Sequence, residues 1–599
     1  MKILGISAFF HDASATLIVD GAIIAAVQEE RFSRKKNDAN FPEKSIAFCL
    51  SVAGIDASEL NAIVFYEKPF LKFERIVDEL TNQAPFGLIS FAKNMPIWVK
   101  QKLFMKREIK EKMNTLFGEM DWKKTEILFS KHHLSHAASA FFVSPFKDAA
   151  ILTVDGVGEI ASATISRGFD SKIETLKELN FPNSVGLFYS AFTSFLGFEV
   201  NNGEYKVMGL APYAFQKEKE VKTIVERLKK NVITIHETGA IHLNPDYFQF
   251  NHSSSMLKTK KVEELLSIQA VIDTNRLSSS HVCLAQAIQL ITEEVLLKMV
   301  KYTKQLIPSD NLCLAGGLAL NCVANGKIKE SAIFKNVYIQ PAAGDAGGSL
   351  GAAIASYYMY FNNIRTVSKD TMQNALLGPS FSEKEILKVL SAEKIPFENV
   401  TSNQLINRAV EFLIQGKSIG WFQGRMEFGP RALGNRSIIA NPLLAKTQSE
   451  LNIKVKKRES FRPFAPILLE EEFEKYFGQD YSSPYMLFAH KLKKEYHLEF
   501  QLTDNLIESI NQSRSLFPSV THVDYSSRIQ TVDEQSNPLV FELLKAFKIK
   551  TGFGVLVNTS FNVKDEPIVC SPSDAIDCFL KTDIDVLIID NFIVEKTQL

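Results

Sequence analysis

The chain lacks paired cysteines, long apolar runs and an excess of charge of either sign. Its six cysteines are scattered without a Cys-x-x-Cys pair, which predicts buried thiols and argues against disulfides or a zinc site. No apolar stretch approaches the roughly 20 residues of a membrane-spanning helix, since even the window 84–104 contains Lys93 and Lys100. Lysine plus arginine equal aspartate plus glutamate at 68 each, so no global field attracts DNA or tRNA. We therefore expect no membrane and no nucleic-acid partner.

The first residues, MKILGISAFF, do not form a secretion signal, because His11 and Asp12 interrupt the apolar run. This predicts a cytoplasmic protein. A hydrophobic content of 46% and a charged content of 23% are those of an ordinary soluble globular protein. Because 599 residues are too many for one hydrophobic core, we expect two large domains.

A pattern of strand, acidic loop and hairpin occurs twice in the first 180 residues. Alternating β-branched runs around an Asp-Gly pair are typical of a β-hairpin, and a similar arrangement follows about 140 residues later. The expected strands cover 3–8, 15–19 and 22–29 in the first copy, and 150–154, 161–166 and 172–179 in the second. This internal repeat predicts a duplicated α/β unit whose repeated loops line a cleft, as in actin-like and sugar-kinase-like nucleotide-binding folds.

Two glycine-rich loops follow the second copy, each at an expected strand-to-helix junction. They are AGGLALN at 315–321 and PAAGDAGGS at 341–349. Glycine lets the backbone approach a phosphate closely, and the helix that follows presents free N–H groups to it. Two such loops in succession favour a nucleotide site over simple chain reversal.

The segment KHHLSHAASAFF at 131–142 places three of the eleven histidines within five residues. His132 and His136 are four apart, so on a helix they share a face and can reach one metal ion. An amphipathic helix with histidines at polar positions beside small residues explains the segment equally well. The segment alone leaves both interpretations open.

The remaining segments set the domain boundaries. Residues 70–125 predict a lysine-rich helical insertion with a solvated face, and 250–275 a surface loop with a helix. Residues 361–383 have the composition of a connection between domains. We therefore expect one domain at 1–370 and a second at 385–599, the latter opening with a helix at 404–415 and a strand at 418–423.

Arginine recurs in the constrained loops of the second domain. The loop GRMEFGPRALGNRSI at 424–438 carries Arg425, Arg431 and Arg436 among glycine and proline, so these side chains cannot form a regular helix face. Guanidinium groups bind phosphate or carboxylate in a bidentate manner. Further basic loops follow at 456–466 and 521–530. Several such loops in a charge-neutral chain favour a shared anion pocket over separate surface ion pairs.

The order of these motifs resembles the O-carbamoyltransferase family of the nodulation and antibiotic-tailoring type over nearly the whole chain. The motifs that carry the resemblance are GISAFFHDASA at 5–15, QEERFSRKKND at 28–38, HHLSHAASAFF at 132–142, TVDGVGE at 153–159, GEYKVMGLAPY at 203–213, AGGLALNCVAN at 315–325, GRMEFGPRALGNRSI at 424–438, KRESFRPFAP at 457–466 and NTSFNVKDEPIV at 558–569.

The resemblance implies an α/β protein with an actin-like first domain and a second domain similar to the YrdC carbamoyladenylate-forming domain. It also implies two steps: carbamoyl phosphate and ATP yield carbamoyladenylate, and a hydroxyl of a small-molecule acceptor, a natural product or sugar, then attacks it and releases AMP. The implied cofactors are Fe(II) or another divalent metal, with ATP as co-substrate and Mg(II) as a further candidate. The insertion at 70–125 is a candidate for part of the acceptor pocket or for a homodimer contact.

Site residues follow from the same resemblance, position by position. His132, His136, Asp155 and Asp345 match the metal positions, a donor set that suits a divalent transition ion, whereas His133 is expected to be structural. The implied carbamoyl-phosphate ligands are Arg431, Lys457, Arg462 and Arg528, although a one-residue slip would give the role of Lys457 to Lys456. The implied nucleotide site comprises Gly316, Gly317, Asn321, Gly344 and Lys206. His11 and Asp12 lie in the first acidic loop, where His11 would accept the proton of the acceptor hydroxyl.

Three rival functions remain distinguishable by experiment. A kinase of the actin-like fold would form ADP and a phosphorylated acceptor without carbamoyl phosphate. This function would not explain the arginine-rich second domain. Threonylcarbamoyl transfer to tRNA would label tRNA, and the neutral charge argues against it. A non-enzymatic nucleotide-dependent scaffold would show no turnover.

Overall fold

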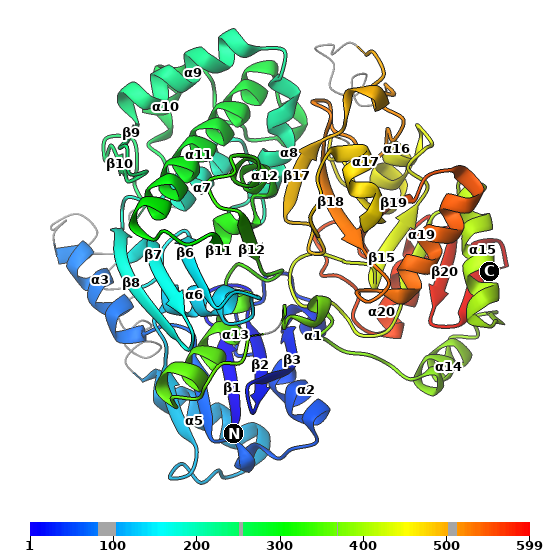
Figure 1. Ribbon diagram of the computed structural model, residues 1–599, viewed down its shortest axis with the longest axis horizontal. Coiled ribbons are helices and arrows are strands. Elements are labelled where there is room, and N and C mark those ends of the chain that lie inside the picture. The colour runs from blue at the N-terminus through cyan, green and yellow to red at the C-terminus, as the bar shows by residue number, and fades with distance from the viewer. Residues whose placement is uncertain (82–103, 251–255, 368, 460, 501–511, 599) are drawn as a thin grey trace. The chain divides into compact units, whose positions relative to one another are not determined.

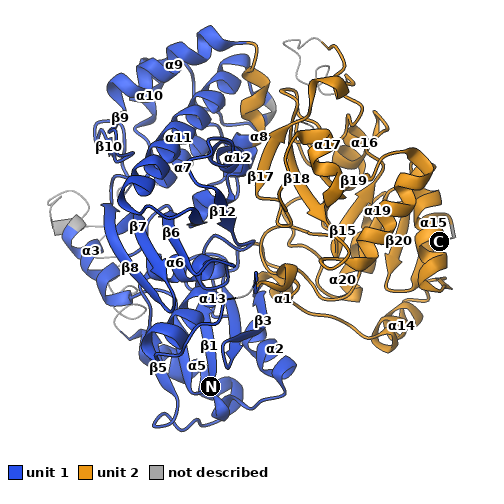
Figure 2. Ribbon diagram, viewed as in Figure 1, with its two compact units in different colours: residues 1–29, 37–208, 217–371 blue, residues 30–36, 209–216, 372–599 orange. Residues whose placement is uncertain are grey.

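The computed structural model describes residues 1–81, 104–250, 256–367, 369–459, 461–500 and 512–598 as a mixed α/β protein of two compact units. Figure 2 colours unit 1 (residues 1–29, 37–208 and 217–371) apart from unit 2 (30–36, 209–216 and 372–599). Unit 2 thus includes two short segments from the first half of the chain. Both segments precede residue 370, so the predicted division into domains at 1–370 and 385–599 does not account for them.

Unit 1 contains two five-stranded sheets of the same topology (Figure 1). In each, three antiparallel strands precede two strands that lie parallel to the first: the order is β3-β2-β1-β4-β5 in one sheet and β8-β7-β6-β11-β12 in the other. The strands are β1 (Lys2–Ser7), β2 (Ser14–Val19), β3 (Ala22–Gln28), β4 (Ala62–Phe65), β5 (Glu126–Phe129), β6 (Asp148–Val154), β7 (Ala161–Phe169), β8 (Lys172–Asn180), β11 (Asn311–Ala315) and β12 (Asn336–Ile339). The predicted repeat, its hairpins and the positions of its strands are therefore confirmed, although β6 begins two residues earlier and β7 ends three residues later than expected.

Two helices carry small residues into the centre of unit 1. They are α6 (His132–Phe141) and α13 (Ala346–Ala355), and all but one of the residues of α6 and all of those of α13 are buried. Their backbones touch because Gly351 has no side chain: a Cβ there would lie 1.7 Å from the carbonyl oxygen of Ser135. This close packing holds the first turn of α6 against the middle of α13.

The other helices of unit 1 cover these sheets or extend beyond them. They are α2 (Glu43–Ala53), α3 (Pro69–Thr81), α5 (Met105–Phe117), α7 (Val185–Phe195), α8 (Glu204–Leu210), α9 (Glu218–Asn231), α10 (Thr259–Leu266), α11 (Ser279–Leu306) and α12 (Cys322–Glu330), of which α8 runs from unit 1 into unit 2. Helices α3 and α5 confirm the helical character of the 70–125 segment, of which residues 82–103 lie outside the described residues. Helix α10 lies in the predicted 250–275 segment.

Within its described residues, unit 2 is built on a nine-stranded sheet of order β13-β21-β20-β14-β15-β19-β16-β18-β17. The strands are β13 (Glu398–Asn399), β14 (Ile419–Phe422), β15 (Arg436–Ala440), β16 (Ala465–Leu469), β17 (Phe488–Lys491), β18 (Ser526–Val532), β19 (Val555–Ser560), β20 (Val586–Ile589) and β21 (Phe592–Glu595). The predicted strand at 418–423 is confirmed as β14.

Alternate residues along the strands of unit 2 point to opposite faces of the sheet, and a separate hydrophobic core covers each face. Trp421 packs with residues of α15 (Ser402–Ile414) and α19 (Pro538–Thr551). Its neighbour Phe422 packs with residues of α14 (Glu383–Ala392) and α20 (Pro572–Lys581). Helix α15 confirms the predicted helix at 404–415, and it begins where Thr401 and Gln404 form a capping box.

Two composition-based expectations bear on the fold. All six cysteines are free and buried, as predicted. Among the residues that the structure describes, none of the helices combines the length and apolarity that a bilayer-spanning segment requires.

Candidate metal centre

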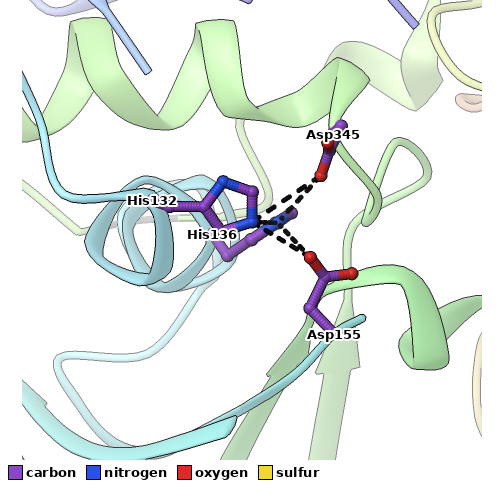
Figure 3. A group of neighbouring side chains, drawn as sticks. All are labelled: His132, His136, Asp155 and Asp345. Atoms are coloured by element: carbon purple, nitrogen blue, oxygen red, sulfur yellow. Dashed lines mark hydrogen bonds and ion pairs between the residues drawn. The ribbon is translucent and has the colours of Figure 1, made fainter. Parts of the chain in front are cut away.

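The first two turns of α6 direct two imidazoles toward two carboxylates (Figure 3). His132 and His136 are one helical turn apart, and their Nε2 atoms lie 3.1 Å from each other. Asp155 follows directly after β6, and Asp345 directly precedes α13. The four side chains, called the metal quartet below, come from three separate segments of unit 1 that the sheets bring together.

The distances within the metal quartet are close to those of ligands around one ion. From His132 Nε2, Asp155 Oδ2 lies 3.0 Å and Asp345 Oδ1 3.8 Å away. From His136 Nε2, the same two oxygens lie 3.8 and 3.3 Å away. Neighbouring ligands at about 2.0–2.2 Å from a tetrahedral or octahedral ion are separated by roughly 2.8–3.6 Å. The distances of 3.0, 3.1 and 3.3 Å fall in this range, and the two of 3.8 Å lie just beyond it. Two neutral imidazoles and two carboxylates also balance the charge of a divalent cation, so the residues fit a metal ion.

The quartet is buried, and its charges depend on one another. Burial opposes protonation of His136, but the carboxylates of Asp155 and Asp345 outweigh it and raise the pKa of His136 to about 10. Burial destabilises the charged form of both carboxylates and so raises their pKa values. The neighbouring histidines outweigh this effect: the pKa of Asp155 lies well below its usual value, and the pKa of Asp345 is also lowered. Without a metal ion, a proton on His136 therefore offsets one of the two buried negative charges.

Metal affinity is accordingly expected to rise with pH. The raised pKa of His136 stabilises the metal-free fold fully below pH 6.5, and this contribution is lost as the pH rises through about 10. A metal ion must displace that proton, so the apparent affinity for Co(II) should rise about tenfold per pH unit between pH 6.5 and 8.5. Calorimetric titration in buffers of different ionisation enthalpy measures both the affinity and the proton release. A pH-independent affinity without proton release would contradict this charge balance.

A backbone amide fixes the orientation of one carboxylate of the quartet. The N–H of Gly317 donates to Asp155 Oδ1 at 2.9 Å, which leaves Oδ2 turned toward the histidines. Gly316 adopts φ 90° and packs so closely that a Cβ would lie 2.3 Å from the carbonyl oxygen of Val154. The loop predicted to bind nucleotide therefore also supports the metal quartet. Sequence reasoning missed this support, although the glycine pair was its visible signal.

His11 and Asp12 lie beside the quartet. His11 Nδ1 is 2.9 Å from Asp12 Oδ2, and His11 Nε2 is 3.6 Å from Asp345 Oδ2. Burial lowers the pKa of His11, but Asp345 and Asp12 outweigh it and raise that pKa to about 9. The structure thus brings the predicted base and the predicted metal ligands into one site.

Other predicted residues of unit 1 have identified partners. His133 lies 2.7 Å from the Thr153 hydroxyl and 2.8 Å from the Ala161 carbonyl, and burial lowers its pKa to about 3, so it is a neutral packing residue. Asn321 caps α12 and donates to Gln289. Gly344 adjoins Leu320, and the buried Lys206 places its ammonium 5.8 Å from the centre of the Phe198 ring.

In unit 2 the arginines of the 424–438 loop divide by environment. Arg436 is fully buried, donates to four carbonyl oxygens and lies over the Phe422 ring at 3.6 Å. Arg425 donates to the carbonyls of Leu377 and Gly378. These two arginines hold the loop, whereas Arg431 is half-buried.

The predicted anion ligands have different surroundings. Arg528 is half-buried on β18. Arg462 forms an ion pair of 3.7 Å with Glu459. Lys457 is exposed at a left-handed backbone position of φ 49°. The four predicted ligands thus all belong to unit 2.

Glu427 organises the loop that carries Arg431, and sequence reasoning missed it. Its Oε1 accepts hydrogen bonds from the N–H groups of Leu433, Asn435 and Arg436. A buried carboxylate with three backbone donors acts as an internal cap for the loop. The signal was an acidic residue inside an otherwise basic motif.

Lys456 and Lys457 have opposite surroundings. The Lys456 ammonium is buried and donates to the backbone and side-chain oxygens of Ser560 and Asn562, and burial lowers its pKa well below its usual range. Lys456→Met should therefore destabilise unit 2 by about 3 kcal/mol, because buried acceptors lose their donor. The matched variant Lys457→Met should change stability by less than about 0.5 kcal/mol. Chemical denaturation compares the two, and equal losses would contradict this division.

The chain resembles known proteins along most of its length. The family models described as "Carbamoyltransferase N-terminus" and "Carbamoyltransferase C-terminus" match residues 2–354 and 410–596. An uncharacterised protein of Synechocystis is 45% identical, over 99% of this chain and 97% of its own length. The nodulation protein NolNO of Sinorhizobium fredii is 34% identical, over 98% of this chain and 79% of its own. A 3'-hydroxymethylcephem-O-carbamoyltransferase of Amycolatopsis lactamdurans is 27% identical, over 76% of this chain and 78% of its own.

Proposed function

Since the chain belongs to the carbamoyltransferase family, we propose that it transfers a carbamoyl group from carbamoyl phosphate to a hydroxyl of a small-molecule acceptor, with ATP as co-substrate. The observation that carries this proposal is the metal quartet with His11 beside it. A general base next to a cation site suits acyl-type transfer to a hydroxyl. We further propose that unit 1 is actin-like, which its duplicated sheets support, and that unit 2 is a YrdC-like activating domain.

The proposed activation joins carbamate to AMP. Water cleaves carbamoyl phosphate to carbamate and phosphate, and a carbamate oxygen then displaces pyrophosphate from the α-phosphorus of ATP. The cationic side chains of Arg431, Lys457, Arg462 and Arg528 in unit 2 would neutralise the charge of the reactants. Lys456, which is engaged with Ser560 and Asn562, is not proposed for this role.

The proposed transfer takes place in unit 1. The acceptor oxygen attacks the carbamoyl carbon, the bond to the AMP oxygen breaks, and the hydroxyl proton passes to His11 Nε2. A divalent ion, for which Fe(II) is our proposal, would be held by the metal quartet and would stabilise the charge of the departing phosphate. The same positive charge would offset that of Asp345, which lowers the pKa of His11 toward the neutral range where a base is effective.

Product analysis tests the proposal. The protein is incubated with ATP, labelled carbamoyl phosphate, Fe(II) under anaerobic conditions and 3'-hydroxymethylcephem as a probe acceptor. We expect AMP and pyrophosphate to form only when carbamoyl phosphate is present. Formation of ADP without carbamoyl phosphate would replace the proposal with a kinase. Label in added tRNA would indicate threonylcarbamoyl-type transfer, and no nucleotide turnover with or without carbamoyl phosphate would favour a scaffold.

A further inference from the structure

Unit 2 includes two short segments from the first half of the chain, residues 30–36 and 209–216. Figure 2 shows helix α1 (Glu30–Ser33) of the first segment in the colour of this unit. The segments overlap two of the motifs that indicate the family, at 28–38 and 203–213, but neither segment contains a predicted site residue. Their contacts within unit 2 indicate what they contribute.

The first segment is bonded to the loop at 424–438, which carries Arg431. Arg31 is 3% exposed, and its Nη2 donates to the carbonyl oxygen of Gly429 at 2.8 Å, two residues before Arg431. Arg31 Nη1 also forms a 3.0 Å ion pair with Glu30. Gly429 adopts φ 121°, a conformation that residues with a side chain rarely adopt. A charged donor thus holds the loop at this point, and such hydrogen bonds are roughly twice as strong as neutral ones.

The same segment packs against that loop and bonds to a second stretch of backbone. Phe32 contacts a small hydrophobic cluster that includes Met426 and Ala432 of the loop. Arg34 donates from Nη1 and Nη2 to the two carbonyl oxygens of 567–568, at 2.7 and 2.8 Å. The first segment is therefore part of the structure that supports the loop.

The second segment is bonded to the residue before Arg462. Tyr213 is 4% exposed, and its hydroxyl donates to the carbonyl oxygen of Phe461 at 2.8 Å. The Tyr213 ring also lies edge-on to the Phe461 ring, with centroids 6.3 Å apart, and to the His522 ring, 5.0 Å away. His522 Nε2 in turn lies 2.8 Å from the carbonyl oxygen of Gly209, so the segment is held at two points.

Both contacts end on backbone next to a predicted anion ligand. Gly429 precedes Arg431 by two residues, and Phe461 precedes Arg462 by one. An arginine binds an anion through a planar fork whose bonds depend on its direction, so the backbone that carries it must be held in place. Glu427 supplies part of that support from within the 424–438 loop. The two segments add support from the first half of the chain.

We propose that Arg31 and Tyr213 are positioning residues for carbamoyl phosphate, which act through the backbone that carries Arg431 and Arg462 respectively. In the proposed function these two arginines bind carbamoyl phosphate, and the inference rests on that function. Arg31 and Tyr213 themselves do not contact the substrate. The activating unit is then complete only with segments from both halves of the chain.

Exchange of labelled pyrophosphate into ATP by the full chain, in the presence of carbamoyl phosphate, tests the inference. Arg31→Met removes the donor to Gly429, and Tyr213→Phe removes the donor to Phe461. Because a displacement of about 1 Å can cost on the order of 100-fold, we expect each variant to raise the KM for carbamoyl phosphate about tenfold. The KM for ATP should change by less than about twofold, which separates a lost ligand contact from a general loss of activity.

Double variants show whether each residue acts through its own arginine. Arg431→Lys and Arg462→Lys keep the charge but lose the planar fork. In the Arg431→Lys background, Arg31→Met should raise the KM by less than about twofold, whereas in the Arg462→Lys background it should keep its effect of about tenfold. Tyr213→Phe should show the reverse pattern. Equal effects in both backgrounds would show that Arg31 and Tyr213 serve the fold alone, and would overturn the inference.

Arg408→Met is the matched control, because Arg408 is a half-buried arginine of α15 that forms a 3.1 Å ion pair with Glu595. It should leave the KM for carbamoyl phosphate unchanged. Chemical denaturation compares the stability of all variants. If Arg31→Met does not fold, Arg31→Lys takes its place. The compact ammonium keeps the charge beside Glu30 but cannot serve Glu30 and Gly429 together as the guanidinium does.

The two levels of the proposal fail in different ways. If the unmodified protein shows no exchange that depends on carbamoyl phosphate, the proposed function itself is wrong. If that exchange occurs and a variant has the KM of the unmodified protein, the positioning role of the substituted residue is wrong while the proposed function stands.

Discussion

Replacing Asp345 with asparagine is expected to lower the affinity for Co(II) or Fe(II) by more than about 100-fold, beyond the usual cost of losing a group that only orients a ligand. The amide keeps the shape of the side chain but removes one of the two negative charges that balance a divalent ion. Carbamoyl transfer should fall by about 1000-fold, since the departing phosphate loses its electrostatic partner. Metal titration and product formation measure the two losses.

The Asp345→Asn variant should also change how His11 and His136 titrate. Asp345 raises the pKa of both histidines, so both values should fall when its charge is removed. NMR titration of the metal-free protein measures this shift. Asp170→Asn is a suitable control because that carboxylate is 64% exposed and lies outside the quartet. Metal affinity equal to that of the unmodified protein would show that Asp345 is not a ligand.

Replacing Gly351 with alanine is expected to reduce both stability and metal binding. The new methyl group would lie 1.7 Å from the Ser135 carbonyl, a backbone atom that cannot rotate away. Helix α13 must therefore move from α6, which we expect to cost about 3 kcal/mol, at the upper end for overpacking. The same movement separates Asp345 from His132 and His136. Denaturant unfolding and Co(II) titration check the two effects.

Gly209→Ala is the matched control for this substitution. Gly209 lies in helix α8, where a Cβ would meet nothing within 4 Å. Because alanine favours a helix over glycine by about 0.5–1 kcal/mol, this variant should be as stable as the unmodified protein or slightly more so. If Gly351→Ala behaved in the same way, the close packing of α6 and α13 would not be what holds the metal quartet together.

The sequence predicted much of unit 1 because its signals are local. Alternating apolar residues and an Asp-Gly turn specify a hairpin without help from the rest of the chain, and β1–β3 and β6–β8 formed as expected. The spacing of His132 and His136 specifies a shared helix face in the same way. Their approach to Asp155 and Asp345 was expected only from resemblance to a family, and the structure brings the four side chains together.

Neighbouring basic residues in unit 2 could not be distinguished from the sequence. Lys456 and Lys457 have the same charge, and only burial against Ser560 and Asn562 separates the former from the latter. In the same way, Arg436 and Arg431 belong to one motif, but the carbonyls around Arg436 enclose it completely. The partners of Lys456 lie 104 and 106 positions away, and Pro379 lies 57 positions from Arg436, so local pattern does not reveal either burial.

The sequence alone determined the duplicated α/β plan, the pair of histidines on one helix face and the absence of an excess charge, because each depends on residue type and short spacing. Tertiary structure decided which residues face the metal quartet and which serve packing. Tyr66 joins β4 to α6 and α13, and Gly317 reaches Asp155 across 162 positions of the chain. Such contacts arise only when distant segments are buried against one another, since burial makes a missing hydrogen bond or a misplaced methyl group costly.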